Sequence, residues 1–162
     1  MSAHAEHIRK HRQLMKDRAT PAINRLVEEH REYSIDPDQS GSASVTNYVI
    51  FGRAGDEPVV FKYFYDQERR AREVYGLKHW TPSGIVPRLY RDDGELLIVI
   101  ERFPGGFLPD RDQEGFAEID AEQMGFNLGV ATAKFCAVPM SRKQADDFET
   151  RFYGGQKLEA AQ

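Results

Sequence analysis

A lysine in the middle of an aromatic and β-branched run constrains this chain more than any other feature. Lys62 lies at the centre of the run from Val59 to Tyr65, and residues of these types favour a strand. Side chains alternate between the two faces of a strand, so Lys62 shares its face with Val60 and Phe64. An ammonium group on an apolar face requires a carboxylate, a bound anion or an edge position open to water. The simplest alternative is a lysine that extends to solvent from an edge strand.

The next segment offers a carboxylate partner for this lysine. Residues 67–79 have the pattern of a helix, with Asp66 as its N-cap. Glu73 aligns with the inward apolar residues of that helix, and we expect it to pair with Lys62. Glu68, at the start of the helix, is a poorer partner.

Four strands are expected, over residues 45–51, 59–65, 88–91 and 96–103. A short turn that contains glycine joins the first two strands, and Asp93-Gly94, a strong hairpin signal, joins the last two. The polar stretch from Ser34 to Ser44 is expected to be a loop. Hairpins followed by helices indicate an α+β fold, in which a helix packs on an antiparallel sheet.

Helices are expected both before and after the strands along the sequence. A weak helical pattern covers residues 5–16, and a stronger helix is expected to begin where Thr20 caps Pro21. After the sheet, residues 121–138 and 142–152 have helical patterns. The antiparallel sheet is therefore flanked by N-terminal and C-terminal helices.

The composition restricts the class of protein. A chain of 162 residues suits one ordinary domain. Its formal net charge of −4 provides no overall basic field for nucleic acid or an anionic membrane, so any anion site must be local. No apolar stretch has the length of a membrane span. The only cysteine, Cys136, has apolar neighbours and is expected in the core. We expect a cytoplasmic protein that binds neither nucleic acid nor membranes.

Together, these segments resemble the N-terminal lobe of the aminoglycoside phosphotransferase and choline kinase-like family, distant relatives of the protein kinases. The resemblance extends from Ile23 to Pro139. It implies that Lys62 corresponds to the strand lysine that holds the α- and β-phosphates of ATP. It also implies that Glu73 corresponds to the helix glutamate that orients this lysine.

Two further segments carry the resemblance. Residues 41–48 are similar to the loop that covers the nucleotide in this family, and residues 98–105 are similar to its hinge, whose backbone groups bond the edge of adenine. The additional nucleotide contacts that the resemblance implies are Ser44, Thr46, Asn47, Glu101, Arg102 and Phe103.

The catalytic part of the family pattern has no counterpart in this sequence. The family uses a His-Gly-Asp run with a later Asn, and a separate metal-binding Asp, but none of the five histidines here is followed by Gly-Asp. We therefore assign no catalytic residue and no metal ligand within the chain. The general base and the protein ligands of the Mg²⁺ that accompanies ATP are expected outside it.

The resemblance divides the chain into three parts. Residues 1–20 are expected to form a polar helical extension, residues 21–106 a kinase-like lobe with its hinge, and residues 107–162 a helical segment that leads toward a C-terminal lobe. The predicted function is the nucleotide-binding lobe of an ATP-dependent small-molecule phosphotransferase that is not catalytically complete by itself. Its expected partners are the nucleotide and either a C-terminal lobe or a second copy of the chain.

A second function class stays open. A lobe of this kind without its partner lobe exposes apolar surface, and exposed apolar surface favours association. The alternative is therefore a non-catalytic, kinase-like interaction or assembly module.

Overall fold

A computed structural model of the chain describes residues 3–37, 41–43, 46–103 and 121–153. The elements in these residues are α1 (Ala3–Glu29), β1 (Tyr33–Ile35), β2 (Ser42–Ala43), β3 (Asn47–Ala54), β4 (Glu57–Phe64), α2 (Gln67–Trp80), the short 3₁₀ helix η1 (Thr81–Ser83), β5 (Leu89–Asp92), β6 (Leu97–Glu101), α3 (Ala121–Cys136) and α4 (Arg142–Tyr153). All strand pairings among them are antiparallel. The predicted α+β fold with an antiparallel sheet is confirmed.

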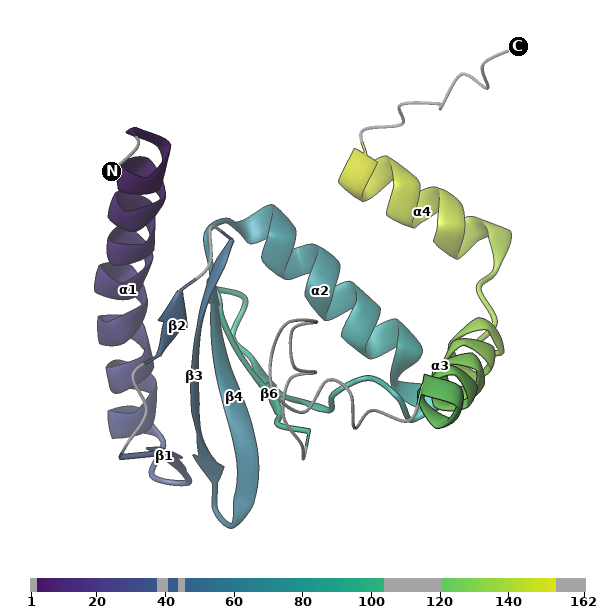
Figure 1. The fold of residues 1–162 in the computed structure, drawn as a ribbon, viewed down its shortest axis with the longest axis horizontal. Coiled ribbons are helices and arrows are strands. Elements are labelled where there is room, and N and C mark those ends of the chain that lie inside the picture. The colour runs from purple at the N-terminus through teal and green to yellow at the C-terminus, as the bar shows by residue number, and fades with distance from the viewer. Residues whose placement is uncertain (1–2, 38–40, 44–45, 104–120, 154–162) are drawn as a thin grey trace.

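The sheet lies between two helices. Its strand order is β1-β3-β4-β6-β5, and the short β2 also pairs with β3. Helix α1 covers one face and α2 covers the other (Figure 1). Strand β4 is central, because β3 and β6 bond to its two edges.

Each face of the sheet has its own apolar core. The core under α1 includes Met15, Ala19, Ile23, Leu26, Tyr33, Val59, Phe61 and Val99. The core under α2 consists of Phe64, Val74, Leu77, Ile98 and Ile100, with Val60 and others partly buried around it. Strand β4 contributes to both cores by alternation, as the pattern of its side chains predicts.

Helix α1 passes through Pro21 without a break, so the expected helix start at this residue is wrong. Met15, Ala19 and Ile23 are fully buried on one stripe of the helix. Burial of such a stripe stabilises a continuous helix enough to offset the hydrogen bond that proline removes. Thr20 does not cap a new helix, because its hydroxyl donates to the carbonyl of Lys16 at 2.9 Å.

The expected loop over residues 34–44 contains two short strands, so this expectation is also wrong in part. Strand β1 pairs Ser34 with Arg53 and β2 pairs Ala43 with Tyr48, both across β3. A Cβ atom at Gly52 would lie 2.1 Å from the carbonyl oxygen of Ser34. A glycine in β3 therefore allows β1 to approach, and this contact is not visible in the local sequence.

The two predicted hairpin turns and the predicted N-cap of α2 are confirmed. Gly55 and Gly94 have φ angles of 59° and 80°, the left-handed conformations that the two hairpin turns require. The side chain of Asp66 accepts a hydrogen bond from the N–H of Arg69 at 2.8 Å, which is the expected N-cap of α2. Within the described residues, none of the helices combines the length and the apolar character needed to cross a bilayer.

Helix α3 is apolar and largely exposed. Phe126 and Leu128 are 67% and 68% exposed, and Phe135 stacks on Trp80 of α2 with ring centroids 4.5 Å apart. The expected core position of Cys136 is wrong, because its side chain is exposed. Its apolar neighbours on α3 are exposed as well, so the helix forms no core around it.

Candidate functional site

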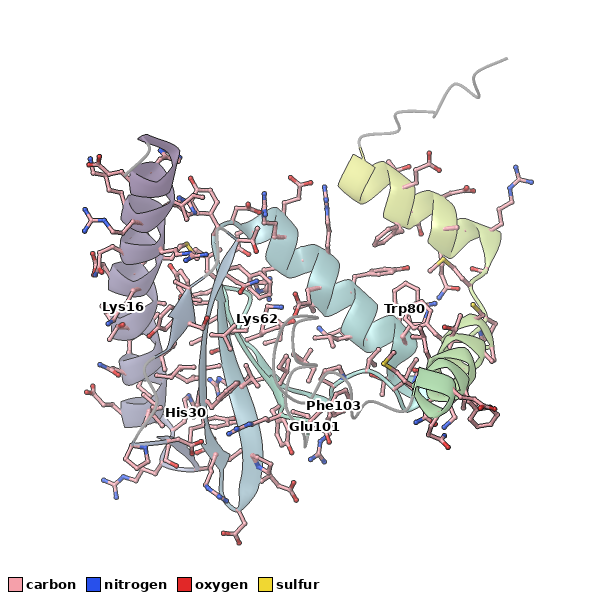
Figure 2. All side chains as sticks on the ribbon, viewed as in Figure 1. Lys16, His30, Lys62, Trp80, Glu101 and Phe103 are labelled. Carbon is pink, nitrogen blue, oxygen red and sulfur yellow. The ribbon has the colours of Figure 1, made fainter. Side chains whose placement is uncertain are left out.

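The predicted pair of Lys62 and Glu73 is present. The Nζ atom of Lys62 lies 2.6 Å from each carboxylate oxygen of Glu73, and the two side chains are 19% and 30% exposed. The ammonium group also lies 5.3 Å from the centre of the Phe64 ring, within the range of a cation–π contact. Figure 2 shows Lys62 on the side of the sheet that faces α2. Because β4 is central, the alternative of a lysine on an edge strand is wrong.

The local fold fixes this pair from both sides. Lys62 lies opposite Val49 of β3 and Ile98 of β6. On α2, the buried side chains of Val74 and Leu77 hold the helix against the sheet. Such a partly buried ion pair contributes little net stability, because desolvation offsets the attraction. What it does provide is a cation held at a defined position and still in contact with solvent.

A second ionic cluster anchors α2 to β5. Arg70 is 8% exposed, and its guanidinium pairs with the carboxylate of Asp92. Lys78 binds the other oxygen of Asp92 at 2.9 Å. Burial lowers the pKa of Arg70. The four-residue spacing from Arg70 to Val74 places Arg70 on the inward stripe of α2.

The nucleotide-loop residues lie partly on the face of Lys62. Asn47 is opposite Phe64, and strand alternation places it on the same face as Lys62. The side-chain amide of Asn47 donates to the hydroxyl of Thr46 at 3.2 Å, and the carbonyl of Thr46 accepts from the N–H of Tyr65 at 3.0 Å. Ser44, the third expected contact in this loop, lies outside the described residues.

The expected hinge contains two N–H groups that are already bonded within the chain. The N–H of Glu101 donates to the carbonyl of Arg88 at 2.8 Å, and that of Arg102 to the carbonyl of Pro58 at 3.1 Å. The carboxylate of Glu101 accepts from the N–H of Arg88 at 3.0 Å. Adenine contacts from this segment would therefore have to use its carbonyl groups or the N–H of Phe103.

The side chains of the hinge segment differ in their roles. The guanidinium of Arg102 lies 3.2 Å from the carboxylate of Asp36 and 4.1 Å from the centre of the Phe51 ring. Phe103 is 47% exposed and lies near Glu101 (Figure 2). Glu101 is opposite Val59, which is three residues or about 10 Å along β4 from Lys62.

Apolar side chains lie between Lys62 and the hinge segment. Val49 and Phe51 of β3 and Val60 of β4 share the face of Lys62 by their register. All three are half-buried; Val60 packs against the core under α2, and the guanidinium of Arg102 lies over the ring of Phe51. Strand alternation predicted Val60 on this face, whereas Val49 and Phe51 of the neighbouring strand were not predicted there.

Taken together, the arrangement suits anion binding beside an apolar surface. Among the described residues, no three His, Cys, Asp or Glu side chains are placed to hold a metal ion. Comparisons of the chain with family models, with curated proteins and with solved structures give no match.

Proposed function

We propose that this chain is the nucleotide-binding lobe of an ATP-dependent small-molecule phosphotransferase, similar to the aminoglycoside phosphotransferase family. The observation that carries the proposal is the bond from the Lys62 ammonium to both oxygens of Glu73 at 2.6 Å. Protein kinases require a strand lysine and a helix glutamate to be paired in this way, because the lysine holds the phosphates of ATP. A pair with little net value for stability is best explained by such a role.

The surroundings of the pair support the same proposal. The half-buried side chains of Val49 and Val60 would contact the apolar face of adenine, with the guanidinium of Arg102 over Phe51 at their edge, and Asn47 would lie on the phosphate side. The hinge segment at Glu101, about 10 Å along the strand, is at a suitable place for the far end of a nucleotide. The cytoplasm, where ATP is available, is the compartment that this role requires.

Phosphoryl transfer needs more than this lobe. Catalysis of that reaction depends on positioning and on charge stabilisation by metal ions, with an aspartate that accepts the proton of the attacking hydroxyl. The 162 residues contain no His-Gly-Asp run, so the base, the ligands of Mg²⁺ and the site of the acceptor alcohol would come from a C-terminal lobe. The lobe by itself would bind ATP weakly, because one side of the adenine would remain in water.

Calorimetric titration with ATP tests this proposal. Lys62→Met retains an unbranched side chain but removes the charge, and the affinity for ATP is expected to fall about tenfold, as for the loss of one charge-assisted hydrogen bond. Lys143→Met, on the exposed side of α4, is the matched control and should bind as the parent does. Equal affinity of the parent and Lys62→Met would contradict the proposal.

A non-catalytic assembly module is the second candidate, and the exposure of α3 favours it. Phe126 and Leu128 are more than half exposed, and exposed apolar side chains of this size are typical of association surfaces. In this role, the chain would form dimers through α3 and would not need ATP.

Sedimentation equilibrium distinguishes the second candidate from the first. Leu128→Asp is expected to convert an α3-mediated dimer to a monomer, whereas Asn127→Asp adds the same charge without loss of an apolar side chain and should leave the dimer intact. A monomeric parent at all concentrations would exclude self-assembly.

A further inference from the structure

A basic hollow lies on the opposite face of the sheet from Lys62, between α1 and the hairpin of β2 and β3. Its volume is about 460 Å³, which is within the size range of small-molecule sites. Its walls include Ile8, Arg9, Arg12, Lys16, Ala43 and Tyr48. A smaller hollow of about 140 Å³ borders Lys16, Gly41 and Tyr48 as well.

Three cations line the hollow, and none of its described lining residues is a carboxylate. Arg9, Arg12 and Lys16 are spaced three and four residues apart, so they lie on one face of α1. In the part of the chain that the structure describes, none of the three makes an ion pair, whereas Lys10 on the same helix pairs with Glu6 at 2.9 Å. Like charges at this spacing destabilise a helix unless an anion compensates them. This cluster occurs in a chain whose net charge is −4.

The hydroxyl group of Tyr48 adds a neutral donor beside the three cations. Tyr48 is only 3% exposed, and its hydroxyl lies beside Gly41, where an added Cβ would come within 2.1 Å of the oxygen. This hydroxyl makes no hydrogen bond among the described residues. It is not one of the buried polar atoms that lack a partner, so it is open to the hollow and free to donate there. Tyr48 and Gly41 both line the hollow, so a ligand there is a suitable partner for the hydroxyl.

We propose that this hollow binds the phosphate group of a small organic phosphomonoester. The guanidinium groups of Arg9 and Arg12 suit bidentate contacts to phosphate oxygens, and Lys16 adds a third charge. The hydroxyl of Tyr48 donates to a further oxygen. A dianionic group matches three cations better than a single carboxylate does, and the apolar walls contact the organic part of the ligand.

The proposed site is separate from the nucleotide site. Strand β3 presents Tyr48 toward α1 and its neighbour Asn47 toward α2, because successive side chains alternate. A ligand in the basic hollow therefore does not contact Lys62, and Lys62→Met is expected to leave this binding unchanged. An experiment can therefore distinguish loss of ligand binding at one site from loss of binding at the other.

The test is a titration of the ¹⁵N-labelled chain with phenyl phosphate, in which the amide chemical shifts are measured at each ligand concentration. The amides of Arg12, Gly41 and Tyr48 are expected to shift and saturate. The dissociation constant should rise about tenfold in Tyr48→Phe and by a larger factor in Arg12→Ala/Lys16→Ala. Arg18→Ala removes an exposed cation of α1 that does not line the hollow, and it should bind as the parent does.

Two results would overturn the proposal. One is binding of phenyl phosphate by Arg12→Ala/Lys16→Ala as tight as by the parent. The other is co-sedimentation of the chain with phosphatidylserine vesicles together with no shift in phenyl phosphate, which would assign the cations to a membrane surface instead. Circular dichroism melting of each variant verifies that the fold is intact, as expected because Arg12, Lys16 and Arg18 are exposed and Tyr48→Phe retains the buried ring.

Discussion

At the scale of single residues, the chain contains cations with very different environments. Lys62 and Arg70 are largely buried and each has a carboxylate partner, whereas Arg12 and Lys16 are exposed and line a hollow. The pairing of Lys62 could be predicted, because strand alternation and helix periodicity are both local patterns. The burial of Arg70 was not predicted, because it depends on the position of α2 against β5 in the folded chain.

The value of the Lys62 pair can be measured by removal of its carboxylate. Glu73→Gln leaves the ammonium group mostly buried without a counter-charge, and a loss of about 1–3 kcal/mol in the free energy of unfolding is expected. Glu68→Gln on the same helix affects an exposed pair with Arg72 and should cost less than about 1 kcal/mol. Urea denaturation measures both. Equal losses in the two variants would show that Glu73 has no special role.

Tyr33 is expected to make stability depend on pH in the alkaline range. Burial raises the pKa of Tyr33 above its ordinary value of 10.0, with the charge of Glu32 as the next cause. The folded chain therefore favours the neutral phenol. This contribution to stability is complete below pH 10 and is lost as the pH rises through the raised pKa.

The matching experiment compares Tyr33→Phe with the parent in urea on both sides of pH 10. The parent should lose stability more steeply with rising pH than the variant, because only the parent has this buried phenol. Parallel curves for the two proteins would contradict the assigned cause.

At the scale of elements, the sequence was most informative where a local signal decides the structure. The turns at Gly55 and Gly94 and the cap at Asp66 were predicted, because each depends on only a few neighbouring residues. The continuation of α1 through Pro21 and the strand β1 were missed, because both depend on packing against β3 and β4, which are distant in sequence. The candidate site shows the same division: the pair of Lys62 and Glu73 was predicted, but the positions of Val49 and Phe51 beside it were not.

Replacement of the proline in α1 tests the continuous helix. Pro21 is exposed inside the helix and lacks the N–H that would bond to the carbonyl of Asp17. Pro21→Ala is expected to raise the free energy of unfolding by about 1–2 kcal/mol, after allowance for the more flexible unfolded chain. If Pro21 instead began a separate helix, the substitution would be neutral or slightly destabilising in the same urea experiment.

The anchor between α2 and β5 gives a prediction at the same scale. Asp92→Asn leaves the buried guanidinium of Arg70 without its counter-charge, and a loss of about 3 kcal/mol is expected. Lys78→Ala removes the exposed member of the cluster, which is 61% exposed, and should cost about 1 kcal/mol or less. Denaturation curves that rank the two variants in the opposite order would contradict this account of the anchor.

At the scale of the whole molecule, the sheet separates two surfaces of different chemistry. Helix α2 covers one face of the sheet and α1 the other (Figure 1). Lys62 lies on the face under α2 (Figure 2), and the basic hollow lies beside α1. Composition alone did not predict this separation, because the net charge of −4 conceals a local excess of cations. Both surfaces are proposed to bind phosphate groups, so binding of ATP must be located as well as detected.

The most direct test of the central claim is therefore a titration of the ¹⁵N-labelled chain with millimolar ATP, with amide shifts mapped on the fold. The account predicts shifts at Val60, Lys62 and Glu73 that are lost in Lys62→Met and retained in Arg12→Ala/Lys16→Ala. Shifts confined to the α1 side, or shifts at Val60 and Glu73 that persist in Lys62→Met, would contradict the claim that the Lys62 face binds the nucleotide.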